Sequence, residues 1–339
     1  MRASRVPFTW VSLYTRFHMM KDAVLAFPEQ FAFVPTIQNV DQMPKRYSRV
    51  IVAGMGGSHL AADLLAAYGT CEQEIFIHED YGLPAFISHD TFVIASSYSG
   101  NTEETIDAYH EARRLGVACA VMATGGALLK LAQEQSVPFI QIPSTGIQPR
   151  SALGFSLIAM ATLLGLEDDL ERIRQAGNAC DPAALEETGS DIAAQFDGCT
   201  PIIYASRANA SLAYNWKIKL NETGKIPAFY NAFPELNHNE MTGFDVGHHA
   251  QGRAKQFCTV LLSDDEDHPR IQKRMSILAG LYEDKGVRVE RVDVSDVEVW
   301  SKVFRALLIA DWTAITIAHM TGAEDEQVPM VESFKKQLA

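Results

Sequence analysis

The sequence lacks the features that define several protein classes. Among its 339 residues there are only five cysteines, no C-x-x-C pair and no uninterrupted apolar run of membrane-span length. An odd number of scattered cysteines in a long chain predicts neither a disulfide framework nor a cysteine zinc site. The cysteines are Cys71, Cys119, Cys180, Cys199 and Cys258. Without a membrane span or a signal peptide, we expect a soluble cytoplasmic protein that does not contact membranes.

Basic residues are also scarce. Lys and Arg number 29 against 42 Asp and Glu, which gives a formal net charge of −13. Affinity for nucleic acids and anionic membranes comes mostly from clustered Lys and Arg, so we expect neither as a partner. Backbone N–H groups can still bind a single small anion, so the net charge does not exclude a small anionic ligand.

The chain is long and apolar enough for two domains. Hydrophobic residues make up 47% of it, and no low-complexity run interrupts it. From residue 49, short apolar segments alternate with helical ones, which favours βαβ units and parallel sheets with helices on both faces. We expect strands at 49–53, 74–80, 91–96, 117–123, 138–143, 200–207, 255–265 and 287–294. Helices are expected after most of them, including 208–222, 297–320 and a C-terminal tail at 328–338.

An acidic, helix-prone segment without a strand separates the two halves. We therefore predict an N-terminal α/β domain with a leading helix at 1–165, a helical connector at 166–196, and a C-terminal α/β domain with a terminal helix at 197–339. Met19 and Met20 precede the first predicted helix, so residues 1–18 are either an extension or the product of a mis-chosen start.

A glycine turn, Gly54-Met55-Gly56-Gly57-Ser58, ends the first strand and opens a helix. The dinucleotide fingerprint G-x-G-x-x-G would need glycine at position 59, where this chain has His59. Glu79 and Asp80 end the next strand at a distance that suits a ribose contact, which keeps a nucleotide hypothesis open. A simple tight turn is the other alternative.

A second polar turn favours a phosphate group. Ser97, Ser99 and Thr102 lie between a strand and a helix, where hydroxyls and the free N–H groups of the helix N-terminus can surround one anion. Ordinary helix capping would need only one such residue. No lysine follows as in an ATP-binding P-loop, so a monophosphate is the better ligand.

The two turns together resemble those of a sugar isomerase (SIS) domain, a fold that binds phosphorylated sugars. The matching segments are G-G-S at 56–58 and S-Y-S-G-N-T-E-E-T at 97–105. The resemblance implies two doubly wound αβα domains and places the substrate phosphate on Gly57, Ser58, Ser97, Ser99 and Thr102. It does not by itself imply a reaction.

The segment 214–245 is dense in polar residues and contains Glu222 and His238. A carboxylate and an imidazole beside a sugar phosphate could move a proton between C1 and C2 and open the ring. Taken alone, a solvated charge at a helix end and a capping histidine explain the two residues equally well.

Longer motifs resemble the bifunctional phosphoglucose/phosphomannose isomerase family. They are W-K-I-K-L-N-E at 216–222, P-E-L-N-H-N-E at 234–240, F-P-E-Q at 27–30, I-Q-P-R at 147–150 and F-K-K at 334–336. The resemblance implies that Glu222 is the base acting through a cis-enediol, that Arg150 stabilises its charge, and that His238, from the other subunit of a homodimer, opens the ring with Lys335.

Two positions leave alternatives. Lys336 is adjacent to Lys335, and the spacing of Val331 and Phe334 favours Lys335 because their apolar face would place it at the edge of the core. Thr223 and Gly224 depart from the N-E-N-A-K that the family pattern leads us to expect after the base.

We therefore expect an isomerase that interconverts glucose 6-phosphate and fructose 6-phosphate without a cofactor or a metal, with mannose 6-phosphate as a second candidate substrate. Adjacent histidines such as His248 and His249 rarely chelate one ion together. The alternatives are a non-catalytic SIS-type sugar-phosphate regulator, or an isomerase of another sugar phosphate.

Overall fold

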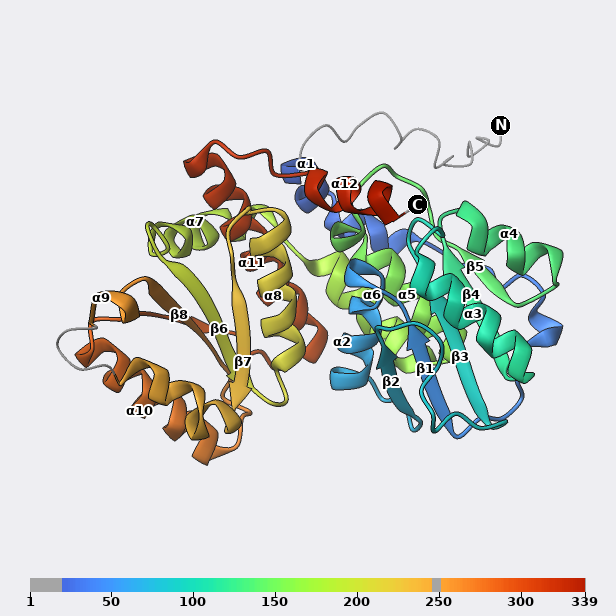
Figure 1. Cartoon of the computed structure of the whole chain (residues 1–339), viewed down its shortest axis with the longest axis horizontal. Coiled ribbons are helices and arrows are strands. Elements are labelled where there is room, and N and C mark those ends of the chain that lie inside the picture. The colour runs from blue at the N-terminus through green and yellow to red at the C-terminus, as the bar shows by residue number, and fades with distance from the viewer. Residues whose placement is uncertain (1–19, 246–250, 339) are drawn as a thin grey trace, which may run out of the picture.

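The structure is a computed structural model that describes residues 20–245 and 251–338. Two parallel sheets lie side by side, each with helices on both faces (Figure 1). The first sheet has the order β2-β1-β3-β4-β5. Its strands are β1 (Arg49–Ala53), β2 (Glu74–His78), β3 (Thr91–Ser96), β4 (Ala118–Ala123) and β5 (Phe139–Gln141).

The second sheet has the order β7-β6-β8-β9, so it repeats the strand order of the first four strands. Its members are β6 (Thr200–Ser206), β7 (Phe229–Phe233), β8 (Phe257–Ser263) and β9 (Arg288–Asp293). The predicted fold class is confirmed. The sequence did not predict β7, an edge strand with two exposed residues that lies inside the polar segment after α8.

Alternate residues of the central strands face two different apolar cores. Val50 and Val52 of β1 point into one cluster, while Ile51 points into another on the opposite face of the sheet. Strands buried on both faces read as continuous apolar runs, which is why they could be found in the sequence. The helices of this domain are α1 (Met20–Leu25), α2 (Leu60–Tyr68), α3 (Glu103–Leu115), α4 (Gly126–Glu134) and α5 (Leu153–Leu164).

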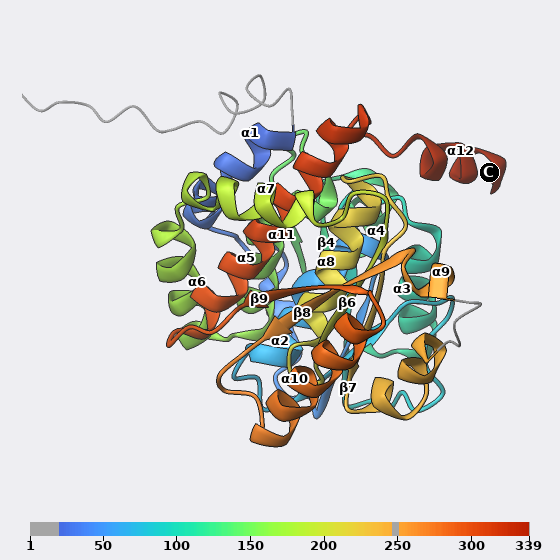
Figure 2. The ribbon, with the colours of Figure 1, turned by 90° about the vertical axis from the view of Figure 1, so that its left-hand side faces the viewer.

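The second domain is built in the same way. Figure 2 faces this domain and shows α10 and α11 on different sides of its strands. Its helices are α8 (Ala210–Glu222), the short α9 (Gln251–Ala254), α10 (Pro269–Asp284), α11 (Val299–Thr321) and the terminal α12 (Pro329–Leu338). One apolar cluster contains residues of both sheets, among them Val52 and Val260, so the two domains share a core.

Helix α11 has the length and composition of a membrane span, the one such helix in the described part of the chain. Its most apolar stretch is 78% buried within the fold. The indole Nε1 of Trp312 donates to the carbonyl of Pro182 at 2.7 Å. This burial and this hydrogen bond show that α11 is packed inside the fold.

The segment between the two sheets is helical, as its sequence indicates, but it is also tightly packed. It forms α6 (Glu167–Ala179) and α7 (Glu186–Ala194). A Cβ at Gly177 would lie 2.3 Å from the ring of Phe31, and one at Gly189 would lie 2.4 Å from Cβ of Trp312. Glycine therefore lets α6 approach the first domain and lets α7 approach α11.

The cysteines differ in one respect from the sequence-based expectation. Cys199 and Cys258 form a disulfide with their Cα atoms 5.8 Å apart, whereas Cys71, Cys119 and Cys180 are free. The two partners are 59 residues apart in sequence and become neighbours because β6 pairs with β8. This pairing of strands could not be inferred from cysteine spacing.

Replacing Gly189 by Ala should destabilise the protein by about 1–3 kcal/mol, because the added methyl group would overlap Trp312 and the α11 backbone. Urea unfolding measures the change. Gly280→Ala in α10 is the matched control: a Cβ there meets open space, so the helix should gain about 0.5–1 kcal/mol. Equal effects of the two substitutions would contradict this account of α7.

Candidate active site

The two polar turns predicted to bind phosphate lie together at the carboxyl edge of the first sheet. The hydroxyl of Ser96 donates to the carbonyl of Ser58 at 2.6 Å, and the Ser58 hydroxyl accepts from the backbone N–H of Tyr98 at 2.9 Å. Each turn thereby holds the other, since β1 and β3 are neighbours. Ligands of open α/β sheets bind at this edge.

The other predicted phosphate-binding hydroxyls belong to the second turn. Ser97 and Thr102 share a hydrogen bond of 2.8 Å, and Ser97 Oγ also accepts from the N–H of Gly100. Ser99 is exposed, and its hydroxyl accepts from the N–H of Asn101 at 3.2 Å. Helix α3 begins directly after Thr102, so its free N–H groups face the same place.

Arg150 lies beside the glycine turn. It belongs to a short helical turn, Pro149–Ser151, that follows β5 and precedes α5. A Cβ at Gly57 would be 2.8 Å from the backbone N of Arg150, so only glycine permits this approach. The sequence-based placement of Arg150 at a helix start after the fifth strand is confirmed.

The side chain of Arg150 is buried and joins the two domains. Nε donates to Oγ1 of Thr223 at 2.8 Å, and Nη1 lies 3.2 Å from Oε2 of Glu222. Nη2 donates to the carbonyls of Asp325 and Glu326 at 3.0 and 2.8 Å. Burial lowers the pKa of Arg150, and Glu222 and Asp311 oppose that shift.

Glu222 ends α8 and is the partly open member of this cluster. Its side chain is 33% exposed, whereas that of Arg150 is 0% exposed. Lys225 Nζ donates to the backbone carbonyls of Glu222 and Gln327. Burial and the charge of Arg150 lower the pKa of Lys225, and nearby carboxylates oppose that effect. The carboxylate of Glu222 is therefore held by a cation yet accessible to a ligand.

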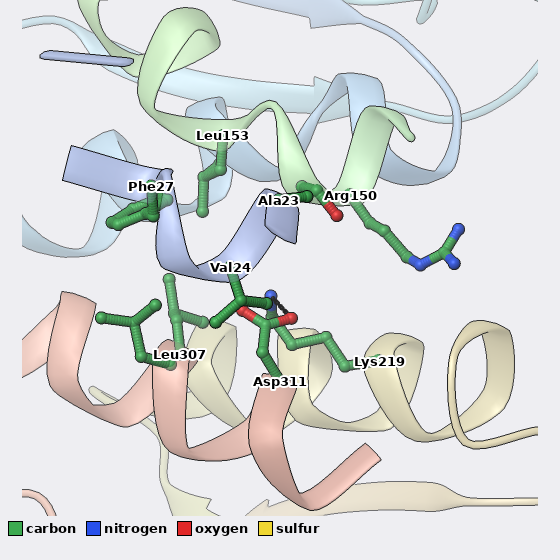
Figure 3. Close-up of a pocket in the computed structure, with 10 residues that line it drawn as sticks. Ala23, Val24, Phe27, Arg150, Leu153, Lys219, Leu307 and Asp311 are labelled. Carbon is green, nitrogen blue, oxygen red and sulfur yellow. Dashed lines mark hydrogen bonds and ion pairs between the residues drawn. The ribbon is translucent and has the colours of Figure 1, made fainter. Parts of the chain in front are cut away.

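A buried ion pair joins α8 to α11. Lys219 Nζ lies 2.6 Å from Oδ1 of Asp311 in α11, and Figure 3 shows the pair beneath Ala23 and Val24 of α1, with the Arg150 guanidinium directed away from it. Burial raises the pKa of Asp311, and Lys219 and Arg150 counteract this. The cavity that these residues line measures about 10 Å³, room for one water at most.

His238 lies at the other end of the second domain. Helix α8 starts at the carboxyl edge of β6 and returns to its amino edge, so Glu222 ends at the amino edge. His238 follows β7 and is exposed at the carboxyl edge, about 20 Å away along a helix of 13 residues. Figure 1 shows α8 beside β7. One chain does not bring His238 to Glu222.

Lys335 is exposed on α12, where its Nζ lies 3.2 Å from Oε1 of Glu332. The expectation that an apolar face of this helix meets the core is wrong for a single chain, because Val331 and Phe334 are 45% and 62% exposed. The choice between Lys335 and Lys336 that rested on this face therefore loses its support.

Sequence reasoning missed several residues of the cluster. Thr223, taken as a departure from the expected motif, is fully buried and accepts from Arg150. The carbonyls of Asp325 and Glu326 carry no sequence signal at all. His248 and His249, like residues 1–18, lie outside the described residues. Within the described ranges, no group of three or more His, Cys, Asp or Glu side chains could hold a metal ion.

Comparisons with known proteins identify relatives of this chain. Residues 185–338 match the model of the bacterial phospho-glucose isomerase C-terminal SIS domain. A solved relative in fold is tagatose-6-phosphate ketose/aldose isomerase from Escherichia coli, with a TM-score of 0.63, 15% identity and coverage of 96% of both chains. This likeness shows that both α/β domains have the SIS fold.

Curated relatives are closer in sequence. The bifunctional phosphoglucose/phosphomannose isomerase of Caldicellulosiruptor bescii is 32% identical over 94% of this chain and 99% of its own length. The protein of the same name from Aquifex aeolicus is 30% identical over 86% of this chain and 91% of its own length. The chain belongs to the bifunctional phosphoglucose/phosphomannose isomerase family.

Proposed function

We propose that this protein interconverts glucose 6-phosphate and fructose 6-phosphate, and also accepts mannose 6-phosphate, through a cis-enediol intermediate. One observation carries the proposal. An accessible carboxylate, Glu222, is paired at 3.2 Å with a buried guanidinium, Arg150, whose backbone adjoins the glycine turn at Gly57. A base, an oxyanion-stabilising cation and a phosphate site therefore lie together.

The phosphate would anchor the substrate on the first domain. Ser58, Ser97, Ser99 and Thr102 supply hydroxyls, and the α3 N-terminus supplies N–H groups and a positive dipole end. A dianion is thus held in a chain of net charge −13 by neutral groups. The sugar would extend toward the end of α8.

Glu222 would transfer the proton. Its carboxylate removes the proton from C2 of the open-chain aldose, and the electrons of the C–H bond form the C1=C2 bond while the carbonyl oxygen becomes anionic. Arg150 stabilises that charge. The C1 oxyanion takes the proton of the C2 hydroxyl, so the negative charge moves to O2. Glu222 then returns its proton to C1 as the C2–O bond becomes the ketone. Addition of the proton to either face of C2 in the reverse direction gives glucose or mannose 6-phosphate.

Ring opening needs a further acid and base. We assign it to His238 of a second subunit, assisted by a lysine of α12, Lys335 or its neighbour Lys336. The separation of His238 from Glu222 within one chain supports this assignment, because only another copy could bring the two residues to one substrate. We propose accordingly that the enzyme works as a homodimer, and that it is cytoplasmic.

Replacing Glu222 by Gln should lower kcat at least 1,000-fold, roughly the loss expected when the proton-transfer group is removed. Fructose 6-phosphate should still bind, because its phosphate contacts lie on the first domain. A coupled assay with glucose, mannose and fructose 6-phosphates and titration calorimetry measure the two effects. Glu187→Gln, at an exposed position of α7, is the control. Retained turnover in E222Q would refute Glu222 as base.

Arg150→Lys tests the cation. One ammonium group cannot reach Thr223, Glu222 and the carbonyls of residues 325–326 at once, so kcat should fall about 100-fold and stability by about 1–3 kcal/mol. Arg172→Lys, which alters the half-exposed pair with Glu298, should change neither. Wild-type kcat in R150K would contradict a role for the guanidinium in charge stabilisation.

Mixing two inactive variants tests the shared site. If Glu222 and His238 act from different subunits, a hybrid of E222Q and H238A chains has one intact site and one doubly altered site. Equal mixing with subunit exchange should then restore about a quarter of wild-type activity on ring-closed substrate, since half the dimers are hybrids. No recovery despite hybrid formation, shown by native mass spectrometry, would place both residues in one subunit.

A further inference from the structure

Helix α12 carries an apolar stripe that is left exposed in the described chain. Met330, Phe334 and Leu338 recur at every fourth position, and Val331 lies beside them on the same face. None of the ten residues of this helix is buried, and Met330 is 85% exposed. Figure 2 shows α12 standing clear of the other helices. A helix this short is barely stable alone in water, so its apolar face indicates a partner surface.

The segment before α12 is fastened at the candidate active site. Arg150 and Lys225 bind the three consecutive carbonyls of residues 325–327. The carboxylate of Glu324 accepts from the N–H groups of residues 326 and 327 at 2.8 and 2.7 Å. Helix α12 therefore starts beside Glu222 and cannot move away from it without breaking these hydrogen bonds.

A groove of about 310 Å³ runs along α10, on the face of the second sheet opposite α8. Its apolar wall includes Ile277 and Leu281, which are 53% and 46% exposed. Asn237, the neighbour of His238, lines its rim and accepts from Nη1 of Arg274 at 3.1 Å. The α10 groove and His238 thus belong to one surface.

The α10 groove is basic, whereas the segment that leads into α12 is acidic. Arg270, Lys273 and Arg274 line the groove in a chain of net charge −13, and none of them has an ion-pair partner within the described residues. Residues 323–332 contain four carboxylates and no cation. Two exposed apolar surfaces with opposite flanking charges are complementary, which favours their pairing with each other over pairing with another surface.

The groove of the same chain is out of reach of α12. With ten residues the helix is about 15 Å long, and it starts where α8 ends. The groove lies on the other face of the sheet and adjoins His238, at the end where α8 begins. Figures 1 and 2 both show α12 far from α10. A second copy of the chain offers the same groove, and a two-fold axis would fill both grooves at once.

We propose that α12 of each subunit docks into the α10 groove of its partner and so stabilises the homodimer. The inference rests on the proposed function and names the surfaces that its shared site requires. Because α12 starts beside Glu222 of its own chain and the groove adjoins the partner's His238, this docking brings the two residues toward one substrate. It also places the lysines of α12 at the same site.

Photo-crosslinking without substrate tests the contact. With p-benzoylphenylalanine in place of Phe334, links should form to residues 270–281 of another chain. Mixed dimers of ¹⁴N- and ¹⁵N-labelled chains, verified by native mass spectrometry, separate links between chains from links within one. The same probe in place of Val297, a fully exposed residue outside both surfaces, should give no such link. Links from position 334 to its own chain or to another face of the partner, or no links, would overturn the proposal.

The strength of the dimer gives an independent test. Phe334→Glu and Ile277→Lys should each raise the dimer dissociation constant at least about tenfold, because each puts a charge into surface that docking would bury. Sedimentation velocity over a concentration series measures the constant. Both side chains are exposed in one chain, so circular dichroism should show unchanged folding. Val297→Glu should dimerise like the wild type. A monomeric wild type, or a dimer that either substitution leaves unchanged, would refute the docking.

Failure of the proposed function gives a different result. If the wild type isomerises no hexose phosphate, the reaction assignment fails, while the crosslinks and the dissociation constant still report on the docking. If the wild type isomerises but position 334 links elsewhere, the docking fails and the reaction stands. Where both hold, F334E should lose activity on ring-closed substrate at low protein concentration and regain it as the concentration rises.

Discussion

The structure depends on one buried guanidinium. Arg150 comes from the first domain, yet its side-chain donors reach a hydroxyl, a carboxylate and two carbonyls that all belong to the second. A buried cation is stable only when its hydrogen bonds are made, so the domains cannot separate without exposing or orphaning it. The same requirement holds the carboxylate of Glu222 beside the glycine turn at Gly57.

Helix α8 contacts the first domain along its whole length. Asn209, just before its start, accepts from the hydroxyl of Tyr68, Tyr214 stacks on His59, and Glu222 at its end meets Arg150. Tyr68 and His59 run along α2 in the opposite direction, and Arg150 adjoins the glycine turn that precedes α2. The carboxyl edge of the first sheet therefore faces the amino edge of the second. A core shared by both sheets fills the space behind α8. The proposed phosphate-binding turns and the proposed base, Glu222, therefore lie on different domains, and this packing fixes the distance between them.

Much of the fold could be predicted because it is local. Continuous apolar strands such as β1 and β3, turns rich in glycine or hydroxyls, and the apolar pattern of α11 depend on neighbours in sequence. Most of the candidate site could also be named from motifs, a long one for Glu222 and shorter ones for Arg150 and Ser58. Edge strand β7 was not predicted, because two of its residues are exposed and it does not form the continuous apolar run of a buried strand.

The sequence by itself determined the α/β units and indicated which side chains are candidates for the chemistry, since motifs and periodicity are properties of consecutive residues. Only the tertiary structure decided their partners. Thr223 accepts from Arg150 across 73 positions, Lys219 meets Asp311 across 92, and Cys199 joins Cys258 across 59. His59 meets Glu79 and Tyr214 in the same way. Such contacts follow from how sheets and helices pack, and spacing along the chain does not encode them.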